Sequence, residues 1–349
     1  MIRIGIIGTG SMANGHGEAY RQMRGVTLTA CCDIDRRRAE TFAARHGIER
    51  VYDDYRKMLA DAPLDAVSVA TTDDANAPVA IAAAKRKLHV FCEKPLATSL
   101  ADARRMLAAV RKAGVVHGVN FSYRNAAGLQ KAAAAIAAGR IGRVRHVESS
   151  YLQSWLAQDK WGDWRASKGW LWRLATSHGS TGVLGDIGCH IYDMTAMLAG
   201  KIARIDCTLK TFDKAPKNRI GEFVLDANDS FVSTVGFAGG AVGVVHASRW
   251  ACGHLNSLRV RVFGDAGALE VDLDRSRDSY LLCAGAANLR KPRWREVRCA
   301  AAPTLYQRFI RAIRGQAAMR SDFANAVKVQ AYLHHSELSD RTGRPSRVR

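Results

Sequence analysis

A glycine-rich turn directly behind the first apolar run is the feature that most restricts how this chain can fold. The run Ile2–Ile7 has the composition of a buried strand, and Gly8-Thr9-Gly10-Ser11-Met12-Ala13 connects it to a helical pattern. Glycines at such a turn let the backbone approach a pyrophosphate, whose charge is stabilised at a helix N-terminus. Gly-x-Gly-x-x-Ala is a weak motif by itself, but a strand before it and a helix after it are typical of a dinucleotide-binding βαβ unit.

An acidic residue stands where the second strand is expected to end. Asp33 follows the run Val26–Cys32 and lies 23 positions after Gly10. A carboxylate at this place accepts hydrogen bonds from an adenosine ribose and repels a 2′-phosphate, which favours NAD. Arg36-Arg37-Arg38 follow at once and either bind that phosphate or form the exposed start of a helix. NADP therefore stays the alternative cofactor.

The first 120 residues alternate short apolar runs with helical patterns, which is typical of a parallel sheet built from βαβ units. Beyond the two strands above, we expect strands at 66–70, 88–92 and 115–120, and helices at 14–23, 36–46, 77–85 and 101–113. The sequence predicts an α/β protein whose N-terminal domain, residues 1–121, is a Rossmann doubly wound parallel sheet.

The pattern changes after residue 123, where apolar runs recur at hairpin spacing. We expect strands at 144–151, 203–211, 230–237, 241–249, 258–263 and 268–273, and helices at 126–138, 184–198, 306–314 and 323–338. Gly239-Gly240 and Gly264-Asp265-Ala266-Gly267 are turn signals between such strands. A second α+β domain, residues 122–349, is predicted to have a large open, mostly antiparallel sheet with helices on one face.

Glu93-Lys94-Pro95 closes the apolar run 88–92. Ligands of doubly wound sheets bind beyond the carboxyl ends of the strands, so a lysine just past such an end is expected to point at the cofactor. Pro95 disfavours a helical conformation for Lys94 and keeps the chain extended there. The alternative is a surface lysine in a tight turn.

A second titratable group lies far downstream, in Gly185-Asp186-Ile187-Gly188-Cys189-His190. On a helix, Asp186 and His190 are four residues apart and share a face. A histidine that takes a proton and a carboxylate that orients it are what alcohol oxidation requires. The alternative is a core histidine whose polar groups are satisfied by that carboxylate.

These motifs together resemble the glucose–fructose oxidoreductase/inositol dehydrogenase family. The resemblance covers nearly the whole chain, and its residues stand in the right order: Gly8-Thr9-Gly10, Glu93-Lys94-Pro95, Asn120 through Arg124, Gly139-Arg140-Ile141-Gly142 and Asp186-x-x-x-His190. It implies a Rossmann domain followed by an open-sheet domain that supplies the substrate site and an oligomer interface. It also implies NAD(P)-dependent chemistry on sugars, cyclitols and related polyols.

The resemblance further implies roles for single residues. Lys94 is expected to hydrogen-bond the reacting oxygen, His190 to exchange its proton, and Asp186 to bind a neighbouring hydroxyl or orient the histidine. Trp172 and Arg173 resemble a pair near the nicotinamide in a sugar-reductase branch, and Tyr306 is a weaker match to the same branch. The full set expected at the cofactor is Gly8, Thr9, Gly10, Ser11, Met12, Asp33, Ile34, Arg38, Thr71, Thr72, Asn76, Glu93, Lys94, Asn120, Trp172, Arg173 and Tyr306.

Two departures from the family pattern bear on the substrate. A histidine common after the third Rossmann strand is absent, and Pro78 lies near its place. The usual Gly-Gly-Gly before the catalytic aspartate is replaced by Gly179-Ser180-Thr181-Gly182. Trp155, Trp161, Trp164, Trp170 and Trp172 also lie shortly before the catalytic helix, where they either stack on a sugar ring or anchor a loop in a core or subunit interface.

The net charge of +20 lies mostly in the second part of the chain, where residues 121–349 hold 34 Lys/Arg against 19 Asp/Glu. A solvated arginine-rich surface or steering of an anionic substrate accounts for it; no nucleic-acid recognition motif is present. The eight cysteines form no Cys-x-x-Cys pair, so no metal site is predicted. No apolar run reaches the roughly 18 residues that a membrane span needs, so we expect no such span. A core strand that starts at Ile2 leads us to expect no export signal and a cytoplasmic location.

The predicted function is therefore hydride transfer between a sugar, cyclitol or sugar-derivative hydroxyl or carbonyl and NAD, with a homo-oligomer (dimer or tetramer) formed through the C-terminal sheet. Two alternatives stay open: a non-catalytic dinucleotide-binding sensor, and a redox-neutral glycoside lyase or hydrolase that uses NAD transiently.

Overall fold

The computed structural model describes residues 1–348, and the chain divides into two compact units. The first comprises residues 1–121 and 303–330, and the second comprises residues 122–302 and the chain from 331 onward. The sequence-based division placed 303–330 in the second domain. The structure places it in the first, because α10 (Leu305–Ile313) packs its buried residues into the same core cluster as Tyr20 and Phe91.

The first unit contains a six-stranded parallel sheet with the strand order β3-β2-β1-β4-β5-β6, which confirms the predicted Rossmann fold. Its strands are β1 (Ile2–Ile7), β2 (Val26–Cys32), β3 (Arg50–Tyr52), β4 (Ala66–Val69), β5 (His89–Cys92) and β6 (His117–Val119). Its other helices are α1 (Ser11–Arg21), α2 (Arg36–His46), α3 (Tyr55–Asp61), α4 (Asn76–Lys85) and α5 (Leu100–Ala113).

Three features of this unit differ from the sequence-based prediction. The first helix begins at Ser11 instead of residue 14, directly behind the glycine-rich turn. β3 was missed because it is a three-residue edge strand without a fully buried position. α3 was missed because it is only seven residues long, and its start is fixed by Asp54, whose carboxylate accepts from the Arg56 amide.

The second unit is built on a nine-stranded sheet with the order β16-β15-β14-β13-β7-β12-β11-β8-β17. Only β7 and β12 pair in parallel among these neighbours, so the predicted mostly antiparallel sheet is confirmed. The strands are β7 (Val144–Gln153), β8 (Ile202–Lys210), β11 (Ser230–Phe237), β12 (Val242–Ser248), β13 (Asn256–Gly264), β14 (Gly267–Asp272), β15 (Ser279–Ala284), β16 (Arg295–Arg298) and β17 (Ser346–Arg347). β9 (Arg219–Ile220) and β10 (Phe223–Val224) form a separate hairpin.

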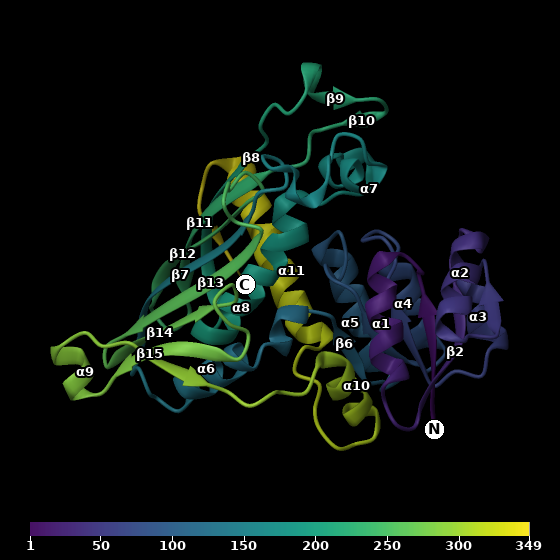
Figure 1. Ribbon diagram of the computed structural model, residues 1–349, viewed down its shortest axis with the longest axis horizontal. Helices are drawn as coiled ribbons and strands as arrows, with labels where there is room; N and C mark the ends of the chain where they lie inside the picture. Colours follow the sequence, from purple (N-terminus) through teal and green to yellow (C-terminus); the bar gives the residue numbers. More distant parts are fainter. Residues whose placement is uncertain (349) are drawn as a thin grey trace. The chain divides into compact units, whose positions relative to one another are not determined.

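Helices cover one face of this sheet. α8 (Cys189–Ala199) packs on β7, β12 and β13, and α6 (Ala127–Ala137) packs on β14 and β15 (Figure 1). α11 (Phe323–Thr342), which the unit division cuts at 330/331, reaches β8, where the Tyr332 hydroxyl accepts from the Ile202 amide. The buried sheet residues alternate with exposed ones such as Val232 and Val242 on the opposite face. In residues 1–348 no helix is long and apolar enough to cross a membrane.

Candidate active site

The glycine-rich turn joins β1 to α1 in the conformation that close approach of a ligand needs. Gly8 has φ +85°, and a Cβ on it would collide with the Ala70 carbonyl. Gly10 is the N-cap of α1, has no capping side chain, and a Cβ added there would meet nothing within 4 Å. The helix therefore starts with amides that no side chain caps, beside open space, which fits the pyrophosphate of a dinucleotide.

Asp33 is held at the end of β2 as an ionised, 8% exposed carboxylate. Its Oδ2 accepts from the Thr9 amide (2.8 Å) and hydroxyl (3.0 Å), and its Oδ1 accepts from the Asp35 amide (3.0 Å) and Arg38 Nη2 (2.9 Å). Burial alone would raise the pKa of Asp33, but these hydrogen bonds lower it. The structure thus brings Thr9, Asp33 and Arg38 together, while Ile34 is 92% exposed beside them.

The loop after β4 is tied to the loop that carries Lys94. Thr71 Oγ1 donates to Asn76 Oδ1 (2.8 Å), and the buried Asn76 donates its Nδ2 to the Pro95 carbonyl (3.1 Å). The Asn76 amide donates to the Thr72 carbonyl at 3.2 Å. The three residues predicted here therefore form one hydrogen-bonded group with the segment behind the lysine.

Glu93 is the centre of a buried polar cluster next to Lys94. Its Oε1 accepts from Asn120 Nδ2 (2.6 Å) and lies 2.7 Å from His16 Nε2, whose Nδ1 lies 2.7 Å from the Ser68 hydroxyl. Burial alone would raise the pKa of Glu93, but the hydrogen bonds from His16 and Asn120 lower it to about 2. The ionised Glu93 Oε2 accepts from the Lys94 amide at 3.2 Å, so the backbone of the lysine is anchored.

Tyr306 belongs to this cluster, because its hydroxyl accepts from Asn120 Nδ2 (3.1 Å) and its ring stands edge-on to His16 at 5.0 Å. The sequence indicated Tyr306 only by resemblance and missed His16 and Ser68. The residues around His16 on α1 do not indicate that it contacts Glu93, which is 77 residues away. The order of the strands in the sheet brings the two side chains together.

In the second unit, Asp186 and His190 lie on one continuous helical segment. Asp186 is in η5 (Leu184–Gly188), a π-helical turn that leads directly into α8, where His190 is 5% exposed. Such turns occur often at functional sites. Gly185 and Gly188 let this segment pack closely, since a Cβ at either position would collide with the Thr181 or Phe231 side chain.

Two tyrosines and an asparagine form a polar wall beside His190. Asn256 Nδ2 donates to the Tyr123 hydroxyl (2.8 Å), the two tyrosine hydroxyls are 2.6 Å apart, and the Tyr151 hydroxyl donates to Asn256 Oδ1 (2.6 Å). The His190 ring lies 4.8 Å from that of Tyr123 and 6.3 Å from that of Tyr151. Burial, followed by the nearby Tyr123 and Asp186, raises the pKa of Tyr151 well above its ordinary value, so the Tyr151 hydroxyl is neutral.

The Tyr123 backbone is fixed by its neighbour. Arg124 in η1 (Ser122–Asn125) donates Nε and Nη2 to the two carboxylate oxygens of Asp193 on α8, at 2.6 and 2.7 Å. This two-point pairing is geometrically specific. The sequence placed Tyr123 and Arg124 in a family motif without a role, and it missed Tyr151 and Asn256.

Trp172 and Arg173 lie in η3 (Trp172–Leu174) of the second unit, with the guanidinium 4.6 Å above the Trp172 ring. The Arg173 carbonyl accepts from the Ser180 hydroxyl at 2.6 Å. The serine in the altered Gly-Ser-Thr-Gly turn therefore ties this turn to η3.

The tryptophans before the catalytic segment mostly anchor their loop. Trp155 and Trp164 are 2% and 1% exposed in a core cluster with Leu171 and Leu174, while Trp170 and Trp172 pack partly against it. Trp161 is 37% exposed. The interpretation of Trp155 and Trp164 as loop anchors is confirmed by this burial. Among residues 1–348 no group of three or more His, Cys, Asp or Glu side chains is placed to hold a metal ion.

Comparison with known proteins places the chain in a family. A model described as "Oxidoreductase family, NAD-binding Rossmann fold" matches residues 2–121, and the GFO/IDH/MocA C-terminal domain model matches residues 129–270. Levoglucosan dehydrogenase of Pseudarthrobacter phenanthrenivorans is 31% identical over 300 residues, covering 78% of this chain and 74% of that protein. Myo-inositol 2-dehydrogenase of Thermotoga maritima is 28% identical over 305 residues, covering 80% and 85%.

Solved structures agree with this assignment. Levoglucosan dehydrogenase in complex with NADH and L-sorbose superimposes with a TM-score of 0.89 at 26% identity, covering 100% of this chain and 99% of that one. Its complex with NADH and levoglucosan gives the same values. The chain therefore belongs to the GFO/IDH/MocA family and is an NAD-dependent oxidoreductase with the Rossmann domain of that family.

Proposed function

We propose that this protein oxidises a hydroxyl group of a sugar, cyclitol or related polyol, or reduces the corresponding carbonyl. The observation that carries the proposal is the wall of Tyr123, Tyr151 and Asn256 beside His190, because hydroxyl and amide groups are suited to bind several sugar hydroxyls. The relatives support the same substrate class, since they are named for levoglucosan, D-apiose and myo-inositol.

We assign the chemistry to three residues. An alcohol loses a hydride only when its proton also leaves, and bound NAD supplies the hydride acceptor. Lys94 hydrogen-bonds the reacting oxygen and stabilises the negative charge that develops on it, which is often the largest catalytic effect. His190 takes the proton as general base, and Asp186 binds a neighbouring hydroxyl or orients the histidine.

The cofactor contacts are assigned in the same way. Gly8 to Met12 would hold the pyrophosphate of the cofactor. Asp33, Ile34 and Arg38 would bind its adenosine end, and the loop that contains Thr71, Thr72 and Asn76 would lie beside them. Glu93, Asn120 and Tyr306 form one buried cluster beside Lys94 and would bind near the nicotinamide, together with Trp172 and Arg173.

A panel assay tests the proposal. Levoglucosan, L-sorbose, D-apiose, myo-inositol and 1,5-anhydro-D-fructose are offered with NAD, NADP, NADH and NADPH, and the change in cofactor absorbance is followed. We expect one sugar to be converted with reduction or oxidation of one cofactor molecule per sugar molecule. Conversion of a glycoside without net NADH would instead identify a redox-neutral lyase or hydrolase, and tight cofactor binding without conversion would identify a sensor.

We also propose a homo-oligomer and a cytoplasmic location. Val232 and Val242 are 55% and 57% exposed on the sheet face that α6 and α8 do not cover, which suits a contact with a second copy. Light scattering of the purified protein tests the oligomer: a monomeric mass at micromolar concentration would exclude it.

A further inference from the structure

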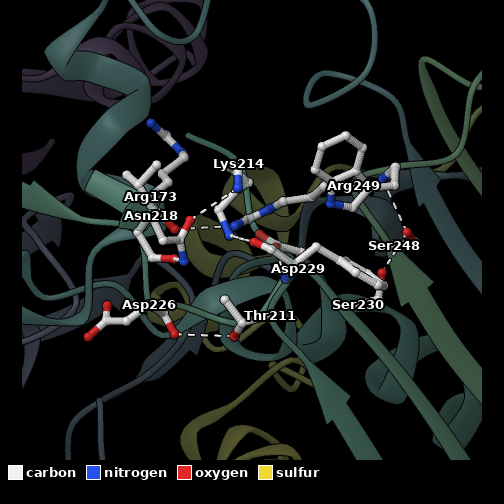
Figure 2. Close-up of polar contacts among 12 residues, drawn as sticks. Arg173, Thr211, Lys214, Asn218, Asp226, Asp229, Ser230, Ser248 and Arg249 are labelled. Carbon is white, nitrogen blue, oxygen red and sulfur yellow. Dashed lines mark hydrogen bonds and ion pairs between the residues drawn. The ribbon is translucent and has the colours of Figure 1, made fainter. Parts of the chain in front are cut away.

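Arg249 is a fully buried cation that contacts the Asp186 carboxylate. It follows β12 directly, and its side chain is 0% exposed. Its Nη2 donates to Asp186 Oδ2 at 2.9 Å. Its Nη1 donates to the Arg173 carbonyl at 3.2 Å, as Figure 2 shows. Neither the motifs of the sequence nor the family resemblance pointed to this arginine.

The guanidinium is fixed on several sides. Its Cζ lies 5.0 Å above the ring of the buried Trp155, in the range of a cation–π interaction. The Arg173 carbonyl that accepts from it is itself held by the Ser180 hydroxyl. The Arg249 amide donates to the Asp229 carbonyl at 3.0 Å, so its backbone is also anchored.

The surrounding charges are balanced. Lys214 Nζ and Asp229 Oδ2 form a second ion pair of 2.7 Å in which both side chains are 0% exposed, and Figure 2 shows it beside Arg249. A buried cation is stable only when paired and hydrogen-bonded, and Asp186 is the carboxylate that Arg249 contacts. Burial lowers the pKa of Arg249, while the charges of Asp186 and, less strongly, Asp229 oppose that change.

We propose that Arg249 is a positioning residue that fixes the orientation of the Asp186 carboxylate from its buried side. This inference rests on the proposed function of Asp186. The rigid, planar guanidinium donates to Asp186 Oδ2 from one fixed direction and so favours one rotamer of the carboxylate. A displaced catalytic group of this kind lowers turnover by up to about 10²-fold without changing the chemistry.

Substitutions at Arg249 in two backgrounds test the inference. Arg249→Lys keeps a cation of similar length but loses the planar fork, and Arg249→Met removes the charge. Both are made in the wild type and in Asp186→Asn, and kcat is measured with the panel sugar that wild type turns over fastest. We expect kcat to fall roughly 10-fold in the lysine variant and about 10²-fold in the methionine variant, with an unchanged KM for NAD.

Two readouts separate positioning from mere stability. In the Asp186→Asn background the same changes should lower kcat by less than about 3-fold, because the effect of Arg249 passes through that carboxylate. In the Asp186 background, loss of the cation raises the pKa of the carboxylate, so the acid limb of the kcat–pH profile should move to higher pH. An arginine that only stabilises the fold would lower kcat by the same factor in both backgrounds.

The matched control is Lys214→Met/Asp229→Asn, which removes the neighbouring buried ion pair with no change of net charge and keeps the Asp229 backbone carbonyl that accepts from the Arg249 amide. It should lower the urea midpoint and leave kcat and its pH profile unchanged. The inference is overturned if Arg249→Lys retains wild-type kcat while Asp186→Asn has a much lower kcat. It is also overturned if the substitutions at Arg249 lower kcat by the same factor in the Asp186→Asn background as in the wild type. An Asp186→Asn variant with wild-type kcat, or no turnover of any sugar by wild type, removes the proposed role of Asp186 and this inference with it.

Discussion

His190, which we propose as the proton acceptor, packs against the rings of Tyr123 and Tyr151 and is only 5% exposed. Replacing His190 by alanine should therefore lower kcat by roughly 10²–10⁴-fold, the usual share of general-base catalysis. NADH affinity, measured by fluorescence titration, should stay within about twofold, because the assigned cofactor contacts lie mainly in the first unit.

The control for His190 is the exposed His334 on α11, whose alanine variant should behave as wild type. Lys94→Met should cost at least as much turnover as His190→Ala, because the charge on the substrate oxygen is then uncompensated. Wild-type kcat in the His190 variant would remove it from the mechanism and leave Lys94 as the leading acid/base group.

Asp33 is expected to determine the choice between NAD and NADP. In the wild type, Arg38 donates to the Asp33 carboxylate. Replacing Asp33 with serine frees Arg38 from this contact and removes the charge that repels a 2′-phosphate. We expect kcat/KM for NAD to fall about tenfold, or about 1.4 kcal/mol, while the value for NADP rises. Adding Arg38→Ala should abolish the gain; a wild type that already prefers NADP tenfold contradicts the assignment.

Glu93 links acidity to stability. Its folded-state pKa of about 2 lies below the ordinary value of about 4.3, so its contribution is complete above that ordinary value and is lost as pH falls toward 2. Wild type should therefore lose about 1–3 kcal/mol more unfolding free energy than Glu93→Gln between pH ~5 and ~3. Urea titrations at several pH values measure this, with the exposed Glu18→Gln as control; equal slopes for all three proteins argue against an ionised buried Glu93.

Among the elements, the turn between β1 and α1 contains two glycines with different roles: Gly8 is required for its positive φ, and Gly10 leaves space for a ligand at the start of the helix. Gly8→Ala should lower the free energy of unfolding by about 1–3 kcal/mol, because alanine is strained at φ +85° and its Cβ meets the Ala70 carbonyl. Gly10→Ala should cost within about 0.5 kcal/mol, since φ is −69° and space is open.

Both glycine variants should bind NADH more weakly, but only Gly10→Ala should do so with a wild-type urea midpoint. Denaturation and fluorescence titration on the same samples measure the two effects. If Gly10→Ala binds NADH as well as wild type does, the pyrophosphate does not approach this turn.

Strong local patterns made most elements predictable. β1, β2, α2 and β11 have the bounds that their apolar runs and caps indicated, and the hairpin at Gly264–Gly267 follows its turn signal. β16 was missed because two of its four residues are arginines, whereas β15 contains the apolar run Tyr280-Leu281-Leu282 and was overlooked despite that signal. The sequence predicts an ordinary α-helix at Asp186, where the structure has a π-helical turn. A one-residue change in hydrogen-bond spacing has no recognisable sequence pattern.

The site was predictable where residues follow a motif and not where the fold alone brings them together. Lys94, Asp186 and the glycine-rich turn stand in recognisable local contexts. Arg249 meets Asp186 from 63 residues away and Asn256 meets Tyr123 from 133 residues away, so only the sheet order reveals these pairs.

At the scale of the whole molecule, the first unit is discontinuous in sequence. Residues 303–330 complete it, since Phe309 and Ile310 are buried in the core cluster that contains Phe91, and Tyr306 packs against that cluster and binds Asn120. A fragment of residues 1–121 should therefore lack a cooperative thermal transition. The same fragment joined to 303–330 by a flexible linker should recover one, as followed by circular dichroism; cooperative melting of 1–121 alone at the same temperature contradicts this view.

This arrangement sets the order in which the protein is completed on the ribosome. The strands of the Rossmann sheet emerge first, yet α10, the helix that covers their core, is translated only after eight of the nine strands of the second sheet, all but β17, have been made. During that interval Tyr20 and Phe91 lack their final covering and present apolar surface to chaperones. We therefore expect the proposed cofactor site to be completed late in synthesis, because Tyr306, whose hydroxyl accepts from Asn120, is translated only then.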